Sequence, residues 1–236
     1  MSISEFQDIP LDSGRAKTEQ PNQPVLVVLD YVEKWIPSFI KESKAEQIEN
    51  EKGLTHRLIC VLQSELNDTY PFCFTDGMED ETKSFSPAID IDVVAKENIY
   101  VRTKVYQKRN RFFAFEAKLL GNTAPYREKE YVIGHDKKTP RGGIERFKKS
   151  IHGIGLDNCG MIGYMFNKSF DQWHQLINTW IDDLIKYNTD SSISWSESDK
   201  LSLQSTDHQK VRLISNHSRS EDRNPIRLYH IWINFT

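Results

Sequence analysis

The chain has 236 residues, of which 38% are hydrophobic and 11% aromatic, a composition that supports a packed core and argues against wholesale disorder. Its formal net charge is −3, so any surface for nucleic acid must be local and not a property of the whole chain. The three cysteines form no Cys-x-x-Cys pair, which argues against structural zinc and is typical of a reducing compartment. The sequence shows no signal pattern and no apolar run of about 18 residues, so we expect a cytoplasmic chain without a membrane segment.

The first third of the chain predicts an arm followed by two helices. Residues 1–24 are polar and contain prolines, and we expect a flexible arm. Apolar residues at helical spacing predict a helix over 25–49, which Pro37 should kink or divide. A second helix is predicted after Glu49, because the apolar stripe between Leu54 and Leu62 is suited to packing on a sheet.

Two later segments are typical of β-strands, because residues 86–94 and 111–120 are short, rich in Ile, Val and Phe, and bounded by turn residues. Side chains alternate between the faces of a strand, so Asp90 and Asp92 should share one face of the first strand and Ile89, Ile91 and Val93 the other. In the second strand Glu116 and Lys118 should lie opposite the face that carries the phenylalanines 113 and 115.

The acids on these two strands predict a metal site. Carboxylates are rarely buried without a partner or a metal, and adjacent strands would aim Asp90 and Glu116 at one point. Two such oxygen donors suit Mg²⁺ (or Mn²⁺), which accepts one or two carboxylates together with waters and phosphate oxygens. Lys118 would lie beside them and hold a water or stabilise charge on a phosphate.

The pattern of Asp90 followed, after a hairpin-length gap, by Glu116-Ala117-Lys118 on a hydrophobic strand resembles the PD-(D/E)xK nuclease superfamily. The proline of the motif is Pro87, three residues before Asp90 and not adjacent to it, and Asp92 competes for the Asp position. The resemblance implies an α/β fold with a restriction-endonuclease-like core, in which a central mixed β-sheet is flanked by helices. It also implies metal-dependent cleavage of phosphodiester bonds.

The resemblance assigns roles to further residues. Many members carry a Glu near the start of the first core helix, which would be Glu51 here; the alternative is an ordinary first-turn acid favoured by the helix dipole. The implied catalytic residues are therefore Asp90, Glu116, Lys118 and Glu51. The implied metal ligands are Asp90, Glu116, Ala117, Glu51 and Asp92.

Two basic stretches are candidates for contacts with nucleic acid. Five basic residues and no acid lie between Arg102 and Arg111, and a second group lies between Lys137 and Lys149. The alternative for both is an ordinary solvated surface. The residues that we expect to contact phosphates are Arg109, Arg111, Arg141, Arg146 and Lys149.

The remaining elements complete one sheet. Residues 67–85 predict a loop with a short edge strand, 99–106 a further strand, 142–152 a helix, and 160–166 a strand buried on both faces. Ser169 begins a capping box before an amphipathic helix. We expect a long loop over residues 188–209 and two terminal strands over residues 211–214 and 225–235. We expect one domain over 25–236, with a core at about 49–166 that matches the αβββαβ order of the superfamily and a helix and strands over 169–236.

Three functions follow. The first is a Mg²⁺-dependent DNA endonuclease, the nuclease subunit of a bacterial restriction or anti-phage defence system, gated by a regulatory protein or by homo-oligomerisation. The second is a non-catalytic nucleic-acid-binding or assembly subunit on the same fold. The third is an unrelated α/β interaction protein in which Asp90, Glu116 and Lys118 form a structural ion-pair cluster.

Overall fold

A computed structural model describes residues 22–77, 89–135, 140–220 and 224–236. Seven strands form one mixed sheet in the order β1-β2-β5-β6-β9-β8-β7. Their bounds are β1 Phe72–Asp76, β2 Ile91–Ala95, β5 Arg111–Leu120, β6 Asn158–Met165, β7 Ser202–Thr206, β8 Lys210–His217 and β9 Ile226–Asn234. The β5–β6 and β6–β9 pairs are parallel, and the other four pairs are antiparallel. The chain is therefore an α/β protein with a mixed sheet flanked by helices, as the sequence predicted.

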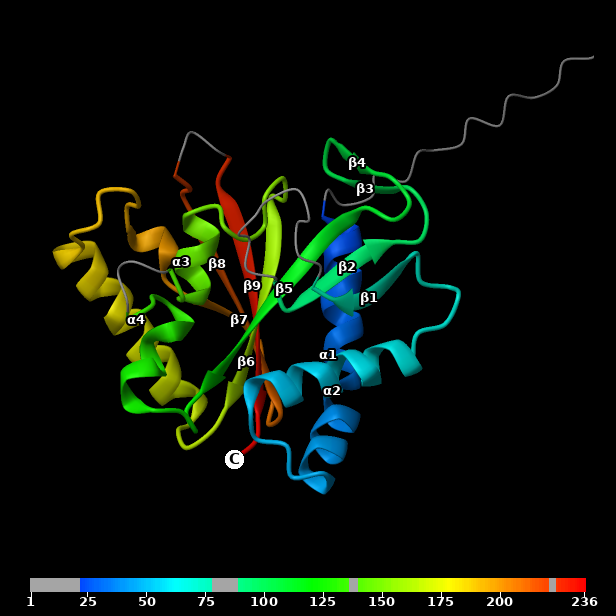
Figure 1. Cartoon of the computed structure of the whole chain (residues 1–236), viewed down its shortest axis with the longest axis horizontal. Coiled ribbons are helices and arrows are strands. Elements are labelled where there is room, and N and C mark those ends of the chain that lie inside the picture. The colour runs from blue at the N-terminus through cyan, green and yellow to red at the C-terminus, as the bar shows by residue number, and fades with distance from the viewer. Residues whose placement is uncertain (1–21, 78–88, 136–139, 221–223) are drawn as a thin grey trace, which may run out of the picture.

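The sheet lies between two helical layers (Figure 1). One layer holds α1 Gln23–Ala45 and α2 Glu51–Ser64, and the other holds η1 Pro125–Tyr131, α3 Gly143–Lys148 and α4 Phe170–Tyr187. Alternation along β5 divides the core accordingly, because Phe113 and Phe115 pack in the first layer and Ala114 and Leu120 in the second. None of the helices in the described part of the chain is both long and apolar enough to span a membrane.

Several predictions from the sequence are confirmed. The helix after Glu49, the edge strand within 67–85, the strand over 111–120 and the buried strand at 160–166 are all present. Ser169 and Gln172 form the expected capping box of α4, and the two terminal strands extend the sheet. The order α2-β1-β2-β5-α3-β6 follows the expected sequence of core elements, with one small hairpin added between β2 and β5.

Other predictions were wrong in their bounds. Helix α1 begins inside the predicted arm and is not divided at Pro37, because buried residues before and after the proline hold both halves in the same core layer. Strand β2 begins only at Ile91, not at residue 86. Ile89 therefore does not share a face with Ile91: Ile91 packs in the first core layer and Ile89 in the second. Residues 86–88 lie outside the described residues. The segment 99–106 is a hairpin, not one strand.

That hairpin comprises β3 Ile99–Val101 and β4 Lys104–Tyr106, and Arg102 at its turn has a left-handed φ of 53°. The loop expected over 188–209 contains η2 Glu197–Asp199 and β7. Every residue of β7 is exposed. The sequence analysis missed this strand because it lacks the alternation of apolar and polar residues that identifies a half-buried strand.

A chain of buried polar side chains crosses the second core layer. Its members are Tyr131, Lys148, Asp199, Ser215, His217, His230 and Trp232. Asp199 accepts from Lys148 Nζ at 2.6 Å and lies 2.5 Å from His217 Nδ1. Because Nδ1 faces a carboxylate, it carries the ring proton, and His217 Nε2 is left to accept a hydrogen bond.

One arrangement of protons satisfies the whole chain. The Ser215 hydroxyl donates to His217 Nε2 at 2.6 Å and accepts from His230 Nε2 at 2.7 Å. Tyr131 then donates to His230 Nδ1 at 2.8 Å and accepts from the Trp232 indole N–H at 2.8 Å. Both histidines are neutral in this arrangement, which agrees with the lowering of both pKa values by burial.

Replacing Ser215 by Ala should therefore destabilise the fold. The substitution leaves two buried ring nitrogens without partners, and we expect the free energy of unfolding in urea to fall by about 1–3 kcal/mol. Ser205→Ala, on the exposed strand β7, is the matched control and should change stability by less than about 0.5 kcal/mol. Equal effects of the two substitutions would contradict the proton assignment.

Candidate active site

The site forms where β5 extends past its neighbour β2. Strand β2 begins at Ile91, which pairs with Phe115, whereas β5 continues to Leu120. Among the described residues, the β2 side of β5 therefore has no strand partner beyond Phe115. Backbone groups at such an edge require other hydrogen-bonding partners.

Two acidic side chains replace the missing strand. Ala117 and Leu119 direct their N–H groups toward the open edge, since alternate residues of a strand point the same way. Asp90 Oδ2 accepts from Ala117 N at 2.7 Å, and Glu51 Oε2 accepts from Leu119 N at 3.1 Å. Asp90 immediately precedes β2, and Glu51 is the first residue of α2.

Lys118 lies between these acids. Its Nζ is 2.7 Å from Glu116 Oε1 and 3.3 Å from Glu51 Oε1, and it donates to the carbonyl oxygen of Ala117 at 2.8 Å. Burial would lower the pKa of this lysine, but Glu116, Glu51 and Asp90 outweigh burial and raise it above its ordinary value. Lys118 is therefore an ammonium ion at neutral pH and is not available as a base.

Glu116 is fully buried among nitrogen groups. Its Oε1 contacts Arg146 NH1 at 2.9 Å as well as Lys118, and its Oε2 lies 3.3 Å from His152 Nε2. Burial acts to raise its pKa, but Lys118, His152 and Arg146 together lower it to about 2. Within the described residues Oε2 has no hydrogen-bond donor, so one oxygen of a buried carboxylate remains unsatisfied.

Asp90 has the opposite electrostatic environment. Burial and the negative charge of Glu116 raise its pKa to about 7, although Lys118 and the hydrogen bond from Ala117 partly counteract them. The two acids thus differ widely in proton affinity. Because Glu116 raises the pKa of Asp90, the two carboxyl groups interact through their charges.

His152 is a site residue that the sequence analysis missed. Helix α3 ends at Lys148, earlier than predicted, because Ser150 adopts a left-handed φ of 55° and Ile151 N bonds back to Arg146 O at 2.8 Å. This turn brings His152 to Glu116 and within 3.3 Å of Arg146 NH1. Burial lowers its pKa to about 4, so the ring is neutral at pH 7. Left-handed turns are usually marked in a sequence by glycine, and the serine at position 150 gives no such sign that the helix ends there.

The other predicted residues are dispersed. Asp92 is buried and its Oδ1 lies 3.1 Å from Arg111 NH1, and Lys149 pairs with Glu145 and Asp190. Arg109 and Arg141 are exposed, whereas Arg146 is in the Glu116 cluster. The residues that the structure brings together are Glu51, Asp90, Glu116, Ala117, Lys118 and Arg146, and residues 136–139 of the second basic stretch lie outside the described residues.

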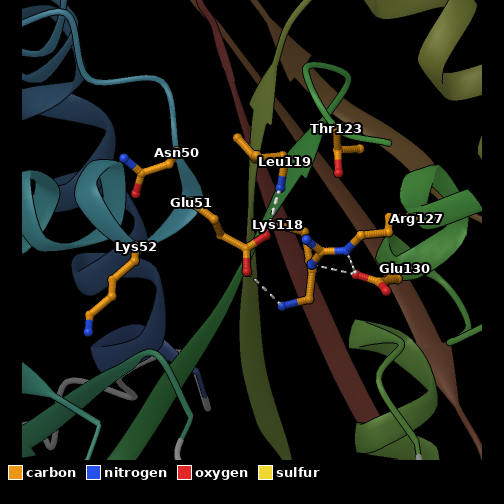
Figure 2. Close-up of a pocket in the computed structure, with 8 residues that line it drawn as sticks. All are labelled: Asn50, Glu51, Lys52, Lys118, Leu119, Thr123, Arg127 and Glu130. Atoms are coloured by element: carbon orange, nitrogen blue, oxygen red, sulfur yellow. Dashed lines mark hydrogen bonds and ion pairs between the residues drawn. The ribbon is translucent and has the colours of Figure 1, made fainter. Parts of the chain in front are cut away.

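A cavity of about 260 Å³ opens beside Lys118. Figure 2 shows Glu51 reaching from α2 toward Lys118 and Leu119 on one side, with Arg127 and Glu130 of η1 on the other. Arg127 NH2 is fixed 2.8 Å from the buried carboxylate of Glu130. The Lys118 end of the cluster is thus reachable from solvent, whereas Glu116 does not line the cavity.

Among the described residues, no group of three or more His, Cys, Asp or Glu side chains is arranged to hold a metal ion by itself. Mg²⁺ commonly takes only one or two carboxylates and completes its shell with water and substrate oxygens. The chain matches no protein-family model, no curated protein and no solved structure.

The raised pKa of Asp90 predicts a gain in stability on removing its charge. A carboxyl group whose pKa is near 7 in the folded state and near 4 in the unfolded state makes the fold less stable as the pH rises between those values. We expect Asp90→Asn to be more stable than the wild type at pH 8, by at least about 1 kcal/mol, and to lose that advantage by pH 4. Urea unfolding at both pH values measures the difference.

Asp92→Asn is the control for this experiment. It removes one partner of a buried ion pair with Arg111 and should destabilise the protein at pH 8. If Asp90→Asn gave the same stability change at pH 4 and pH 8, the raised pKa would be refuted.

Proposed function

We propose that this protein is a Mg²⁺-dependent (or Mn²⁺-dependent) nuclease that hydrolyses phosphodiester bonds of DNA on a restriction-endonuclease-like core. The observation that carries the proposal is the unsatisfied Oε2 of buried Glu116, next to a charged lysine two residues along the same strand. The α2-β1-β2-β5-α3-β6 order and the position of Asp90 at the open edge support the same assignment.

The residues present fit a divalent cation. Glu116 offers a carboxylate oxygen that no protein group satisfies in the described residues, and Asp90 offers a second acid beside it. Both are hard oxygen donors, the type that Mg²⁺ prefers. Glu51 and the carbonyl of Ala117 lie around the same lysine. When bound, Mg²⁺ neutralises charge on the scissile phosphate and lowers the pKa of the attacking water.

The protein's own groups then have separable tasks. Lys118 keeps its proton, so it orients the water or balances charge on the phosphate and does not remove a proton. Glu51 and Glu116 hold its ammonium group in place from two elements. Arg146, whose NH1 lies 2.9 Å from Glu116 Oε1, adds to the cluster a guanidinium, a group suited to binding phosphate oxygens.

One observation favours a non-catalytic alternative. Glu116 Oε1 already contacts two cations, Lys118 and Arg146, so the cluster is largely neutralised by the protein's own charges. A binding or assembly subunit would need nothing more, and the acids would then be structural partners of Lys118. This alternative predicts nucleic-acid affinity without hydrolysis.

We further propose that the activity is gated by a protein partner or by self-association, as in bacterial restriction or anti-phage defence. Within the described residues, one sheet accounts for all strands except the β3–β4 hairpin, and no separate recognition domain accompanies it. A nuclease that acts on DNA needs restraint in a cell. Full, unregulated cleavage by the isolated chain would contradict this part of the proposal.

Removing either Glu116 or Lys118 should abolish hydrolysis. Plasmid and single-stranded DNA are incubated with the protein in Mg²⁺ and then in excess chelator, with and without candidate partners. We expect chelator-sensitive cleavage that Glu116→Gln and Lys118→Met each reduce by about 100-fold or more, because the first removes a carboxylate proposed to hold the cation and the second removes the ammonium group beside the cavity.

Matched controls separate chemistry from folding. Glu145 and Lys148 are also buried and ion-paired, but their partners are Lys149 and Asp199 on the α3 side. Glu145→Gln and Lys148→Met should lower stability and leave cleavage by the folded fraction unchanged. Retained cleavage in Glu116→Gln would refute the proposed site.

Calorimetric titration with Mg²⁺ supplies a readout that does not depend on activity. Wild-type protein should bind the cation, and Glu116→Gln should bind it at least about tenfold more weakly, because one of its two principal carboxylates is neutral. DNA retardation without hydrolysis, together with equal Mg²⁺ affinity in both proteins, would favour the non-catalytic alternative.

A further inference from the structure

The β3–β4 hairpin is not part of the seven-stranded sheet and projects near the N-terminal end of β5 (Figure 1). Alternation gives it two different faces. Ile99 and Val101 are buried in the core layer that contains α1, whereas Tyr100 and its cross-strand partner Val105 are 62% and 53% exposed. An aromatic ring therefore lies on the outside of the molecule beside a small apolar residue.

The charge around this face is positive. Between residues 99 and 111 the sequence contains five basic residues and no acid. Two of them are neutralised, since Lys104 pairs with Asp157 and Arg111 with Asp92. Among the described residues, the three without a carboxylate partner are Arg102, Lys108 and Arg109, all of them exposed.

The hairpin is held in place before any ligand arrives. Lys104 Nζ donates to Gly155 O at 3.2 Å and to Asp157 Oδ1 at 2.7 Å, which ties β4 to the segment before β6. At its base, Tyr106 packs against Phe112 of β5 with ring centroids 6.2 Å apart. A surface ordered in advance loses little conformational freedom on binding.

We propose that the outer face of the β3–β4 hairpin binds single-stranded nucleic acid, with an unpaired base stacked on Tyr100 and phosphates bound by Arg102, Lys108 and Arg109. An exposed aromatic ring, accompanied by cations that pair with no carboxylate in the described part of the chain, is the combination that single-stranded binding requires, because every base has a π-face and every linkage a charge. Two exposed apolar residues are too few for a stable protein interface, which supports nucleic acid as the occupant.

The hairpin connects the two strands beside the proposed active site, since it joins β2 to β5. Five residues separate Arg111 from Glu116, or roughly 17 Å along an extended strand. The hairpin would thus hold unpaired nucleotides a short distance from the cluster. This inference names single-stranded nucleic acid as the substrate of the proposed nuclease, and in that respect it rests on the proposed function. Binding of the single strand can be measured without cleavage.

The test measures binding of a labelled 20-nucleotide DNA by fluorescence anisotropy in chelator, single-stranded and annealed to its complement. We expect Tyr100→Ala to weaken single-strand binding by about tenfold and to leave duplex binding nearly unchanged, because a stacked base contributes about 1–3 kcal/mol. Tyr100→Phe should retain the affinity. Tyr187→Ala, which removes the 73% exposed tyrosine at the end of α4, should have no effect.

A second arm tests the cations. The double substitution Lys108→Ala/Arg109→Ala should reduce the slope of log affinity against log salt by about 1.4, or about 0.7 for each lost phosphate contact. The matched control is Lys41→Ala/Lys44→Ala on the exposed side of α1, which should leave the slope unchanged.

Three results would overturn the inference: no binding of the single strand by the wild type, unchanged affinity in Tyr100→Ala, or equal losses for single strand and duplex. Glu116→Gln distinguishes this failure from failure of the proposed function, since it should lose cleavage and keep single-strand binding. If Tyr100→Ala loses binding but neither the wild type nor any variant cleaves DNA, with or without candidate partners, the hairpin inference stands and the nuclease proposal fails.

Discussion

The organisation of the site depends on one mismatch of strand lengths. Because β2 begins opposite Phe115 while β5 continues to Leu120, the described residues leave the β2 side of residues 116–120 without a strand partner, whereas the other side of β5 pairs with β6. Unpaired backbone N–H groups at this depth are costly, and Asp90 and Glu51 satisfy them. A requirement of β-sheet hydrogen bonding thereby brings two distant acids to the strand that carries Glu116 and Lys118.

The charges of the cluster are balanced unevenly. Glu116 is held ionised by the surrounding cations, whereas Asp90 is near the point of accepting a proton at neutral pH. In the part of the chain that the structure describes, one oxygen of Glu116 has no donor although the carboxylate is fully buried. Buried polar groups are nearly always satisfied, so this oxygen is the feature on which the proposed cation site rests.

Two regions of the fold contrast in how completely their buried polar groups are paired. In the far half of the second layer, the chain from Asp199 to Trp232 pairs its buried groups completely and serves stability. Around Glu116 the described residues leave the pairing incomplete, and a solvent-reachable cavity adjoins Lys118. The two regions therefore use similar residue types. They differ in whether every buried donor and acceptor has a partner: the chain from Asp199 to Trp232 is fully paired, and the Glu116 cluster is the one for which we propose a function.

The sequence by itself determined the class of fold, most of the helices and strands, and the Asp90, Glu116 and Lys118 constellation. Period-two alternation and helical stripes are local signals, so β5, β6 and α4 were predicted with nearly correct bounds. Only the tertiary structure decided where β2 begins, that Ser150 turns the chain to bring His152 to Glu116, and that Arg146 bonds to that carboxylate. These features depend on hydrogen-bond partners far apart in the sequence and on a left-handed turn without glycine, which leave no periodic pattern for a sequence to display.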